Sequence, residues 1–318
     1  MKKIVIMLTA AIVLVACGKK KEEKVLAENT KTVLSGTIKI DGSSTVFPIT
    51  EAVAEEFRAV EPKVKVTVGI SGTGGGFKKF SRGETNLSNA SRPIKSKEKA
   101  ACEANNINYL ELEVAYDGLA VTINPANDWV DSFTVEELKK IWEPTAQGKI
   151  MKWNQIRPEW PNEEIHLFGP GTASGTYDYF SEAICGKKVG TRGDYTASED
   201  DHVLVQGIAG DKYALGFFGL AYYAENKDKL SLIGVHNGTE VVKPSLETVK
   251  NGTYKPLSRP LFLYVNSTSV KSTEVVEFVN FYLDNAGELS KDVGYIPLPA
   301  EKYTVQKEKF KTFVESNK

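Results

Sequence analysis

Residues that build metal centres are scarce in this chain. Its 318 residues include three histidines and three cysteines, and His166, His202 and His236 lie far apart in the sequence. No Cys-x-x-Cys pair occurs, although that spacing marks many zinc and dithiol redox sites. The histidines fit surface or satisfied core positions better than ligand positions. The sequence therefore predicts neither a bound metal nor a cofactor.

Motifs of enzymes that act on phosphate or acyl groups are also missing. The chain has no G-x-x-x-x-G-K-[ST] loop and no G-x-S-x-G turn around Ser174. Its one Ser-x-x-Lys, from Ser96 to Lys99, lies in a charged run typical of a solvated surface. A serine nucleophile needs a base beside it, and the sequence shows none. We therefore predict a protein that is not an enzyme, with a serine-dependent hydrolase as the less favoured alternative.

An excess of positive charge is lacking as well. Loss of Lys2 and Lys3 with an export signal leaves 38 of the 40 basic residues against 41 acidic ones, a net charge near −3. Proteins that bind nucleic acid carry a basic excess that replaces counterions, so this class is disfavoured. An anionic ligand would have to be held by local dipoles and one or two placed cations.

The one long apolar run is at the N terminus, where Met1-Lys2-Lys3 precedes residues 4–16. This run is too short for a permanent membrane span and reads as an export signal. It ends in Leu14-Val15-Ala16-Cys17-Gly18, which resembles the lipobox of bacterial lipoproteins. We expect a signal peptide at 1–16, lipidation of Cys17 and a charged flexible tether over 17–34. The protein would then be exported and lipid-anchored on the extracytoplasmic side, periplasmic or at the cell surface.

Three short loops share one chemistry. They are Gly42–Thr45, Ser71–Gly76 and Ala173–Thr176, and each gathers hydroxyls and backbone N–H groups just before an apolar, helix-like run. Such a loop prepares a helix N-terminus to hold an anion. Because the second and third loops are far apart in the chain, we expect them to close on an oxyanion from two sides.

Repeated units of strand, loop and helix predict an α/β protein with its ligand site at strand C-terminal ends. Alternating apolar residues indicate strands, and apolar residues at helical spacing indicate helices. Between them, Asn89–Pro93 is expected to be a polar loop, since Pro93 does not suit a central strand. The expected strands are 37–40, 63–70, 119–123 and 261–265, and the expected helical segments are 49–60, 77–81 and 270–284.

About 280 residues follow the tether, enough for two lobes of usual size. Two plausible crossings between lobes are Asp117-Gly118 and Leu257–Pro260, each before an apolar strand. Cys102 and Cys185 would then belong to different lobes, which argues against a disulfide. The expected division is lobe 1 from residues 35–118 and 258–318, and lobe 2 from residues 119–257.

Several ordered motifs resemble the phosphate-binding proteins of bacterial ABC-type phosphate transporters, over nearly the whole exported chain. The resemblance implies a two-lobed periplasmic-binding-protein fold, type II-like, that closes on dehydrated phosphate and delivers it to an ABC permease. A monomer and no nucleic-acid partner are expected. The motifs are Asp41–Thr45, Gly72–Gly76, Leu138–Trp142 with Gly148–Ile150 and Trp153, Ser174–Thr176 and Ala214–Phe217.

The resemblance also implies phosphate ligands, with two departures from the best-known pattern. Ser91-Arg92 stands where many relatives have an aspartate after the serine, and Pro170 stands where they have an arginine. We interpret Arg92 as the cation of the site, since a guanidinium suits bidentate oxyanion contacts. Arg192 is a weaker candidate, and its loss should matter less. The expected phosphate ligands are Ser43, Ser44, Thr45, Thr73, Gly74, Ser91, Arg92, Ser174, Gly175 and Thr176.

The missing aspartate bears on selectivity. Phosphate carries a proton near neutral pH and sulfate does not, so a buried acceptor favours phosphate. Asp117 and Asp178 are the candidate acceptors, each with the alternative of a purely structural carboxylate. Another tetrahedral oxyanion, such as sulfate, therefore stays open as the ligand. The four tryptophans are interpreted as packing residues rather than a platform for an organic ligand.

Overall fold

The computed structural model describes residues 34–317, which lie in one compact unit. Residues 1–33, with the predicted signal peptide, Cys17 and nearly all of the predicted tether, lie outside the described residues. Over 34–317, no helix combines the length and the apolar character that a membrane crossing requires. Cys102 and Cys185 are both buried free thiols.

Ten strands form the main sheet, in the order β2-β1-β3-β12-β4-β8-β6-β7, with β13 and β9 also paired to β4. A smaller sheet has the order β11-β10-β5. The strands are β1 (Gly36–Gly42), β2 (Val64–Ile70), β3 (Leu87–Ala90), β4 (Tyr109–Ile123), β5 (Ser132–Thr134), β6 (His166–Gly169), β7 (Thr196–Ala197), β8 (Ala214–Gly219), β9 (Ser231–Leu232), β10 (Gly234–His236), β11 (Val241–Val242), β12 (Ser258–Asn266) and β13 (Ile296–Pro297).

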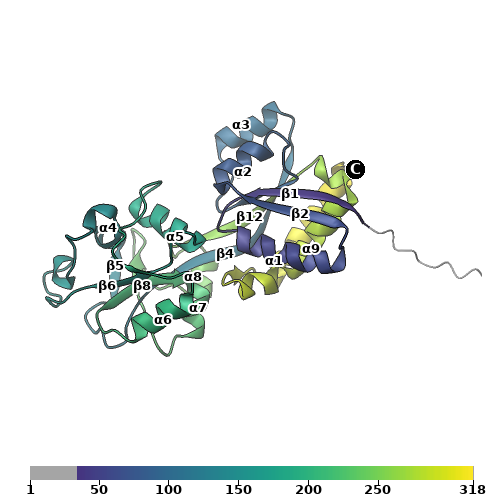
Figure 1. The fold of residues 1–318 in the computed structure, drawn as a ribbon. Coiled ribbons are helices and arrows are strands. Elements are labelled where there is room, and N and C mark those ends of the chain that lie inside the picture. The colour runs from purple at the N-terminus through teal and green to yellow at the C-terminus, as the bar shows by residue number, and fades with distance from the viewer. Residues whose placement is uncertain (1–33, 318) are drawn as a thin grey trace, which may run out of the picture. The chain divides into compact units, whose positions relative to one another are not determined.

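Helices cover the sheet and connect its strands. They are α1 (Phe47–Val60), α2 (Gly72–Phe80), α3 (Ser96–Ala104), α4 (Val135–Trp142), α5 (Gly175–Phe180), α6 (Asp201–Ala209), α7 (Leu220–Glu225), α8 (Leu246–Lys250), α9 (Thr273–Asp292) and α10 (Ala300–Asn317). Figure 1 shows α1 and α9 on one side of the strands β1 and β2, and α2 and α3 on the other.

The first group of strands is packed on both faces. Strands β1, β2 and β3 are parallel, and β12 runs antiparallel to β3. On one face the ring of Phe57 from α1 meets Phe278 of α9 edge-on, with centroids 5.2 Å apart. On the other face Phe77 of α2 meets Tyr264 of β12 at 4.8 Å. Burial of these large rings contributes to the hydrophobic stabilisation of this lobe.

Strand β4 takes part in both halves of the main sheet: the half that contains β12 and the half that contains β8. Its residues Tyr109–Gly118 pair with β12, whereas Leu119–Ile123 pair with β8. The change of partner falls at Asp117-Gly118, where the sequence suggested a crossing. Ser258, at the start of β12, pairs with Gly118. The molecule is therefore an α/β protein of two lobes, and β4 and β12 meet where the lobes join (Figure 1).

The second lobe is built around aromatic side chains. Trp142 and Trp153 are fully buried, and the rings of Phe180 and Phe217 stack with centroids 3.6 Å apart. Trp142 packs edge-on against both of these rings. Trp129 and Trp160 both pack on Trp153. All four tryptophans therefore lie in packing positions, as the sequence indicated.

Two elements differ from the expectation. Helix α2 begins at Gly72, inside the glycine-rich loop, although the apolar pattern indicated a helical segment only from Phe77. Residues Leu87–Ala90 form the central strand β3, so the polar segment begins at Ser91 rather than Asn89. Sequence patterns missed both, because glycine is a poor helix former and Ser-Asn lowers strand propensity, whereas tertiary packing overrides both preferences.

Candidate functional site

A cavity of about 830 Å³ lies where the first two loops face helix α5. Eight of the predicted residues line it, together with Tyr177, Tyr179, Glu182 and Arg259 among others. The predicted residues that line this cavity are Ser43, Ser44, Thr45, Thr73, Gly74, Ser91, Arg92 and Asp178. Ser174, Gly175, Thr176 and Asp117 lie outside its lining.

The first loop joins β1 to α1. Ser43 and Thr45 are each 2 % exposed, and the N–H of Ser43 donates to the carbonyl of Asn89 at 3.0 Å. Helix α1 starts with Pro48 in its first turn, and no side chain caps its N-terminus. The N–H of Phe47 donates to the carbonyl of Ser43 at 3.1 Å and Pro48 has no N–H, so an anion at this end would meet the Ser43–Thr45 loop rather than the first helical N–H groups.

The second loop opens helix α2 and is tied to the segment after β3. The hydroxyl oxygen of Thr73 accepts a hydrogen bond from the N–H of Ser91 at 3.2 Å, and the two hydroxyl oxygens lie 3.1 Å apart. No side chain caps α2. Thr73, Gly74 and Ser91 therefore present hydroxyl and backbone donors to one wall of the cavity.

The third loop, Ala173–Thr176, packs against the first loop. The Ser174 hydroxyl caps α5 by accepting a hydrogen bond from the N–H of Thr176 at 3.1 Å. A Cβ on Gly175 would lie 2.9 Å from the Thr45 Cα, so the two backbones nearly touch. One turn later, Asp178 accepts a hydrogen bond from the Ser44 hydroxyl at 3.0 Å. The two lobes are therefore in direct contact beside the cavity.

Arg92 lines the cavity, but its guanidinium already has an acidic partner. It forms two hydrogen bonds to the carboxylate of Glu98, at 2.7 and 2.8 Å, and lies over the ring of Phe77. The hydrogen bond to Glu98 raises the pKa of Arg92 above its usual range. Burial would raise the pKa of Glu98, but the bonds from Arg92 and from the Lys95 N–H hold it below its ordinary value. Both groups are therefore charged at neutral pH.

Arg259 is the cation to which the sequence reasoning gave no role. Its Nη2 donates to the Thr45 hydroxyl oxygen at 2.9 Å, and its Nε donates to Asp117 Oδ2 at 3.3 Å. Its guanidinium carbon lies 3.6 Å from the centroid of the Tyr179 ring. The available signal was the position of Arg259 in the predicted crossing segment, two residues before a predicted strand.

Asp117 lies behind Arg259. Its carboxylate is buried, at 3 % exposure, and pairs with the arginine. Burial raises the pKa of Asp117 above its ordinary value, and the positive charge of Arg259 opposes this rise. The carboxylate holds Nε of Arg259 while Nη2 reaches Thr45, so the pair orients the guanidinium toward the first loop.

Arg192 is buried in the second lobe, away from the cavity lining. It forms two bonds to Asp194, at 2.5 and 2.7 Å, and donates to the carbonyls of Ile141 and Ile150. Arg192 lowers the pKa of Asp194 through these bonds. Within residues 34–317, no group of three or more His, Cys, Asp or Glu side chains could hold a metal ion.

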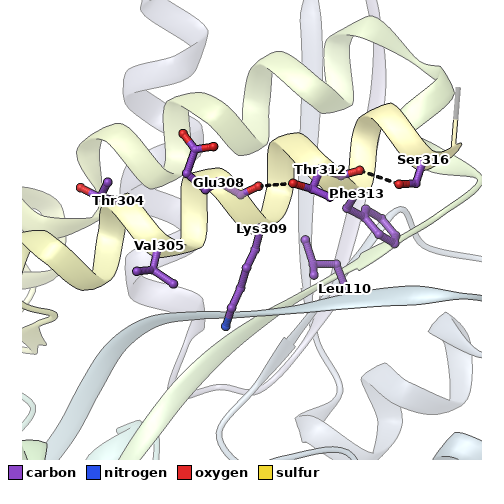
Figure 2. Close-up of a pocket in the computed structure, with 8 residues that line it drawn as sticks. All are labelled: Leu110, Thr304, Val305, Glu308, Lys309, Thr312, Phe313 and Ser316. Atoms are coloured by element: carbon purple, nitrogen blue, oxygen red, sulfur yellow. Dashed lines mark hydrogen bonds between the residues drawn. The ribbon is translucent and has the colours of Figure 1, made fainter.

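A second hollow, of about 630 Å³, follows α10 beside Leu110 (Figure 2). Hydroxyl groups in its lining form hydrogen bonds within α10: Thr312 donates to the carbonyl of Glu308, and Ser316 donates to that of Thr312. Lys309 is the basic side chain that Figure 2 shows beside this surface. The hollow therefore lacks the converging donors that distinguish the first cavity.

Comparisons with known proteins agree with this architecture. A family described as the PBP superfamily domain matches residues 27–286. Protein SphX from Synechococcus elongatus is 54 % identical over 86 % of this chain and 80 % of its own length. The phosphate-binding protein PstS of Staphylococcus saprophyticus is 40 % identical over 86 % of this chain and 84 % of its own.

A crystal structure of a possible phosphate binding protein from Planctomyces limnophilus is also similar. Its TM-score is 0.85 at 49 % identity, covering 88 % of this chain and 99 % of that one. The predicted resemblance and the two-lobed fold are thus confirmed. The chain belongs to the PBP superfamily, in the same family as the SphX and PstS proteins.

Proposed function

We propose that this protein captures inorganic phosphate between its lobes and delivers it to an ABC permease. One observation carries the proposal: hydroxyl and N–H donors of the first two loops line one cavity together with Arg259. Neutral donors aimed at one point in a poorly hydrated cleft bind an oxyanion strongly. The names of the PstS relative and of the Planctomyces limnophilus structure support phosphate as this oxyanion.

The proposed ligands fall into two groups. Ser43, Ser44 and Thr45 of the first loop and Thr73, Gly74 and Ser91 of the second wall contact the phosphate from the lining of the cavity. The loop Ser174–Thr176 approaches the first loop through Gly175 and contributes its donors as the lobes close. This second part depends on a rearrangement on binding, because the loop already contacts the first loop but lies outside the cavity lining.

Arg259 is proposed as the principal cation and Arg92 as the second. Arg259 already donates to Thr45, and its side chain is 17 % exposed. Arg92 donates two hydrogen bonds to Glu98, at 2.7 and 2.8 Å, whereas Arg259 donates one to Asp117, at 3.3 Å. An arginine bonded to a proposed ligand residue and aimed by a buried carboxylate is better placed for bidentate contact with an oxyanion.

Asp178 is the better placed proton acceptor of the two candidates. Its carboxylate lines the cavity and accepts from Ser44, whereas Asp117 lies behind Arg259. A carboxylate that faces the ligand accepts the proton of phosphate and repels sulfate, which has none. We therefore assign the discrimination between the two anions to Asp178.

Closure is proposed as the mechanism. Lobe 1, residues 35–118 and 258–318, carries the first two loops and Arg259, and lobe 2, residues 119–257, carries α5. A ligand that contacts both favours the closed state by its differential contacts there. Lipidation at Cys17 would hold the exported protein, a monomer with a tether over residues 17–34, on the extracytoplasmic face of a membrane beside its permease.

Calorimetric titration of residues 34–318, unfolded and refolded to remove any carried ligand, tests the proposal. Phosphate and then sulfate are titrated at one pH and one salt concentration. Tight binding of phosphate with little binding of sulfate is expected. Equal binding of sulfate would support a binding protein for another tetrahedral oxyanion. Binding of neither anion, or turnover of a phosphoester that is lost in Ser174→Ala, would contradict the proposal.

A further inference from the structure

A buried carboxylate links the first two loops from behind. Asp41 is the residue before Gly42 at the end of β1, and it is 7 % exposed. The Ser71 hydroxyl donates to one carboxylate oxygen of Asp41, and the Lys79 ammonium donates to the other at 2.5 Å. The carboxylate therefore binds two side chains that both belong to the glycine-rich segment.

These two partners stand at opposite ends of helix α2. Ser71 immediately precedes Gly72, the first helical residue, and Lys79 is the residue before the last. Five glycine and serine residues in and before this helix give it little intrinsic preference for a helical conformation. The contacts of Asp41 thus hold both ends of a helix whose own sequence specifies it weakly.

Asp41 itself lies outside the cavity lining, as does Lys79, whereas Ser71 is part of it. Any effect of Asp41 on a ligand must therefore act through the position of the loop. Lys79 also places a positive charge against the carboxylate, so the pair adds little net negative charge beside an anion site.

The neighbouring strand leaves a space for this carboxylate. Gly69 of β2 pairs with Asp41 in the parallel register. A Cβ at Gly69 would lie 2.3 Å from Oδ2 of Asp41, closer than real atoms approach. Gly69 therefore lets the carboxylate occupy its present position, and any larger residue there would displace it.

We propose that Asp41 is a positioning residue for the phosphate site: it fixes the N-terminus of α2 so that Thr73 and the N–H groups of Gly74 and Gly75 face the cavity before the ligand arrives. The inference rests on the proposed function, since phosphate affinity is its readout. A loop that is already in place loses less conformational entropy on binding, so affinity rises.

The first test compares Asp41→Asn, Ser71→Ala and Ser71→Thr by calorimetric phosphate titration. Asp41→Asn and Ser71→Ala should each weaken binding about tenfold, because each removes a charge-assisted hydrogen bond. Ser71→Thr keeps the hydroxyl and should bind like the wild type. The double variant Asp41→Asn/Ser71→Ala should have about the phosphate affinity of whichever single variant binds more weakly, since the two substitutions remove the same contact.

A second variant displaces Asp41 without altering it. Gly69→Ala should weaken phosphate binding by a similar factor, because its methyl group occupies the place of the carboxylate. The control is Asp284→Asn, which breaks the 2.5 Å ion pair with Lys307 on the helices of the same lobe and should leave affinity unchanged. Urea unfolding of each variant without phosphate separates loss of folding from loss of positioning.

The outcomes are distinct. If the wild type binds phosphate, and both Asp41→Asn and Gly69→Ala bind it with wild-type affinity, Asp41 is not a positioning residue. The same holds if Ser71→Thr loses as much affinity as Ser71→Ala. If Asp41→Asn does not fold, Gly69→Ala and the Ser71 pair decide the matter. A wild type that binds no phosphate contradicts the proposed function first, and the role of Asp41 with it.

Discussion

The guanidinium of Arg259 lies over the ring of Tyr179, with its central carbon 3.6 Å from the ring centroid. Arg259 belongs to β12, which pairs with β4 where the lobes join, and Tyr179 belongs to α5. The stacking keeps the hydrogen-bonding edge of the arginine free for Thr45 and Asp117. This cation–π contact therefore links the junction of the lobes to α5 at the lining of the cavity.

Arg259→Lys should weaken phosphate binding about tenfold or more, because an ammonium cannot contact Thr45, Asp117 and an oxyanion as a planar fork does. Lysine keeps the positive charge beside buried Asp117, so it perturbs folding less than alanine. Calorimetric titration measures the change. Arg92→Lys is the matched control and should lose less affinity, and a larger loss there would return the principal role to Arg92.

Asp178→Asn should reduce the preference for phosphate over sulfate about tenfold or more. The amide no longer repels a fully ionised anion, so sulfate binding should strengthen while phosphate binding weakens. Competition titrations with the two anions at pH 7 give the ratio. Glu182→Gln removes another carboxylate from the same cavity lining, and it should change the ratio less than Asp178→Asn, because Asp178 is the one bonded to Ser44 of the first loop. An unchanged ratio in Asp178→Asn would assign the discrimination elsewhere.

Gly175→Ala should impede closure. Its added methyl group would lie 2.9 Å from the Cα of Thr45 and 3.2 Å from its nitrogen, and backbone atoms cannot move aside as a side chain can. Phosphate affinity should fall about tenfold, with little change in the free energy of unfolding without ligand.

Small-angle scattering with phosphate should show a more open Gly175→Ala molecule than the wild type. Gly193→Ala is the control, since its nearest new contact, the Gln147 side-chain oxygen, is an ordinary 3.7 Å. Full affinity in Gly175→Ala would mean that the present approach of the loops is not needed for binding.

Arg192→Met should destabilise the fold and leave the phosphate site intact. The arginine is 2 % exposed and binds Asp194 and two backbone carbonyls. Removing one partner of such a pair costs about 3 kcal/mol, because the remaining groups lose their partner. Urea unfolding measures the loss, and titration should give wild-type affinity. A large loss of affinity in a folded variant would place Arg192 in the site after all.

Asp201 should make the free energy of unfolding decrease as pH rises. Burial raises the pKa of Asp201 to about 6, with the charge of Asp200 adding to the rise. A carboxyl with a raised pKa in the folded state binds more protons there than when unfolded, so its contribution to stability declines from about pH 4 to pH 6.

Asp201→Asn should therefore raise the free energy of unfolding at pH 8 by about 1–2 kcal/mol relative to the wild type, with less gain at pH 4. Urea unfolding at both pH values provides the comparison. The same pH dependence in both proteins would rule out an ionising Asp201 as its source. Asp178→Asn, on α5, serves as the carboxylate control.

Local signals account for what the sequence predicted well. Ile38 and Ile40 alternate with polar residues and form β1, and Ile49, Val53 and Phe57 recur at helical spacing and form the buried face of α1. Hydroxyl and glycine residues between such elements indicated the loops. These patterns depend on residues close in the chain, so one sequence suffices to read them.

The cations were harder to assign. The sequence drew attention to Arg92, whose pairing with Glu98, six residues later, depends on the turn into α3. The crossing segment that contains Arg259 was predicted, but its contacts depend on the alignment of β12 with β4, which places it beside Asp117, 142 residues away in the chain. Pairing between residues so distant depends on strand register, which a local pattern does not contain.

By itself, then, the sequence determined the class of fold, the family and the loops that carry neutral donors, because each is encoded in a short, continuous segment. The tertiary structure alone decided which donors share one cavity, that Ser174 caps its helix and lies outside the cavity lining, and that Arg259 rather than Arg192 adjoins the first loop. Those facts depend on strand register and on the contact of two lobes, and both arise from packing over the whole chain.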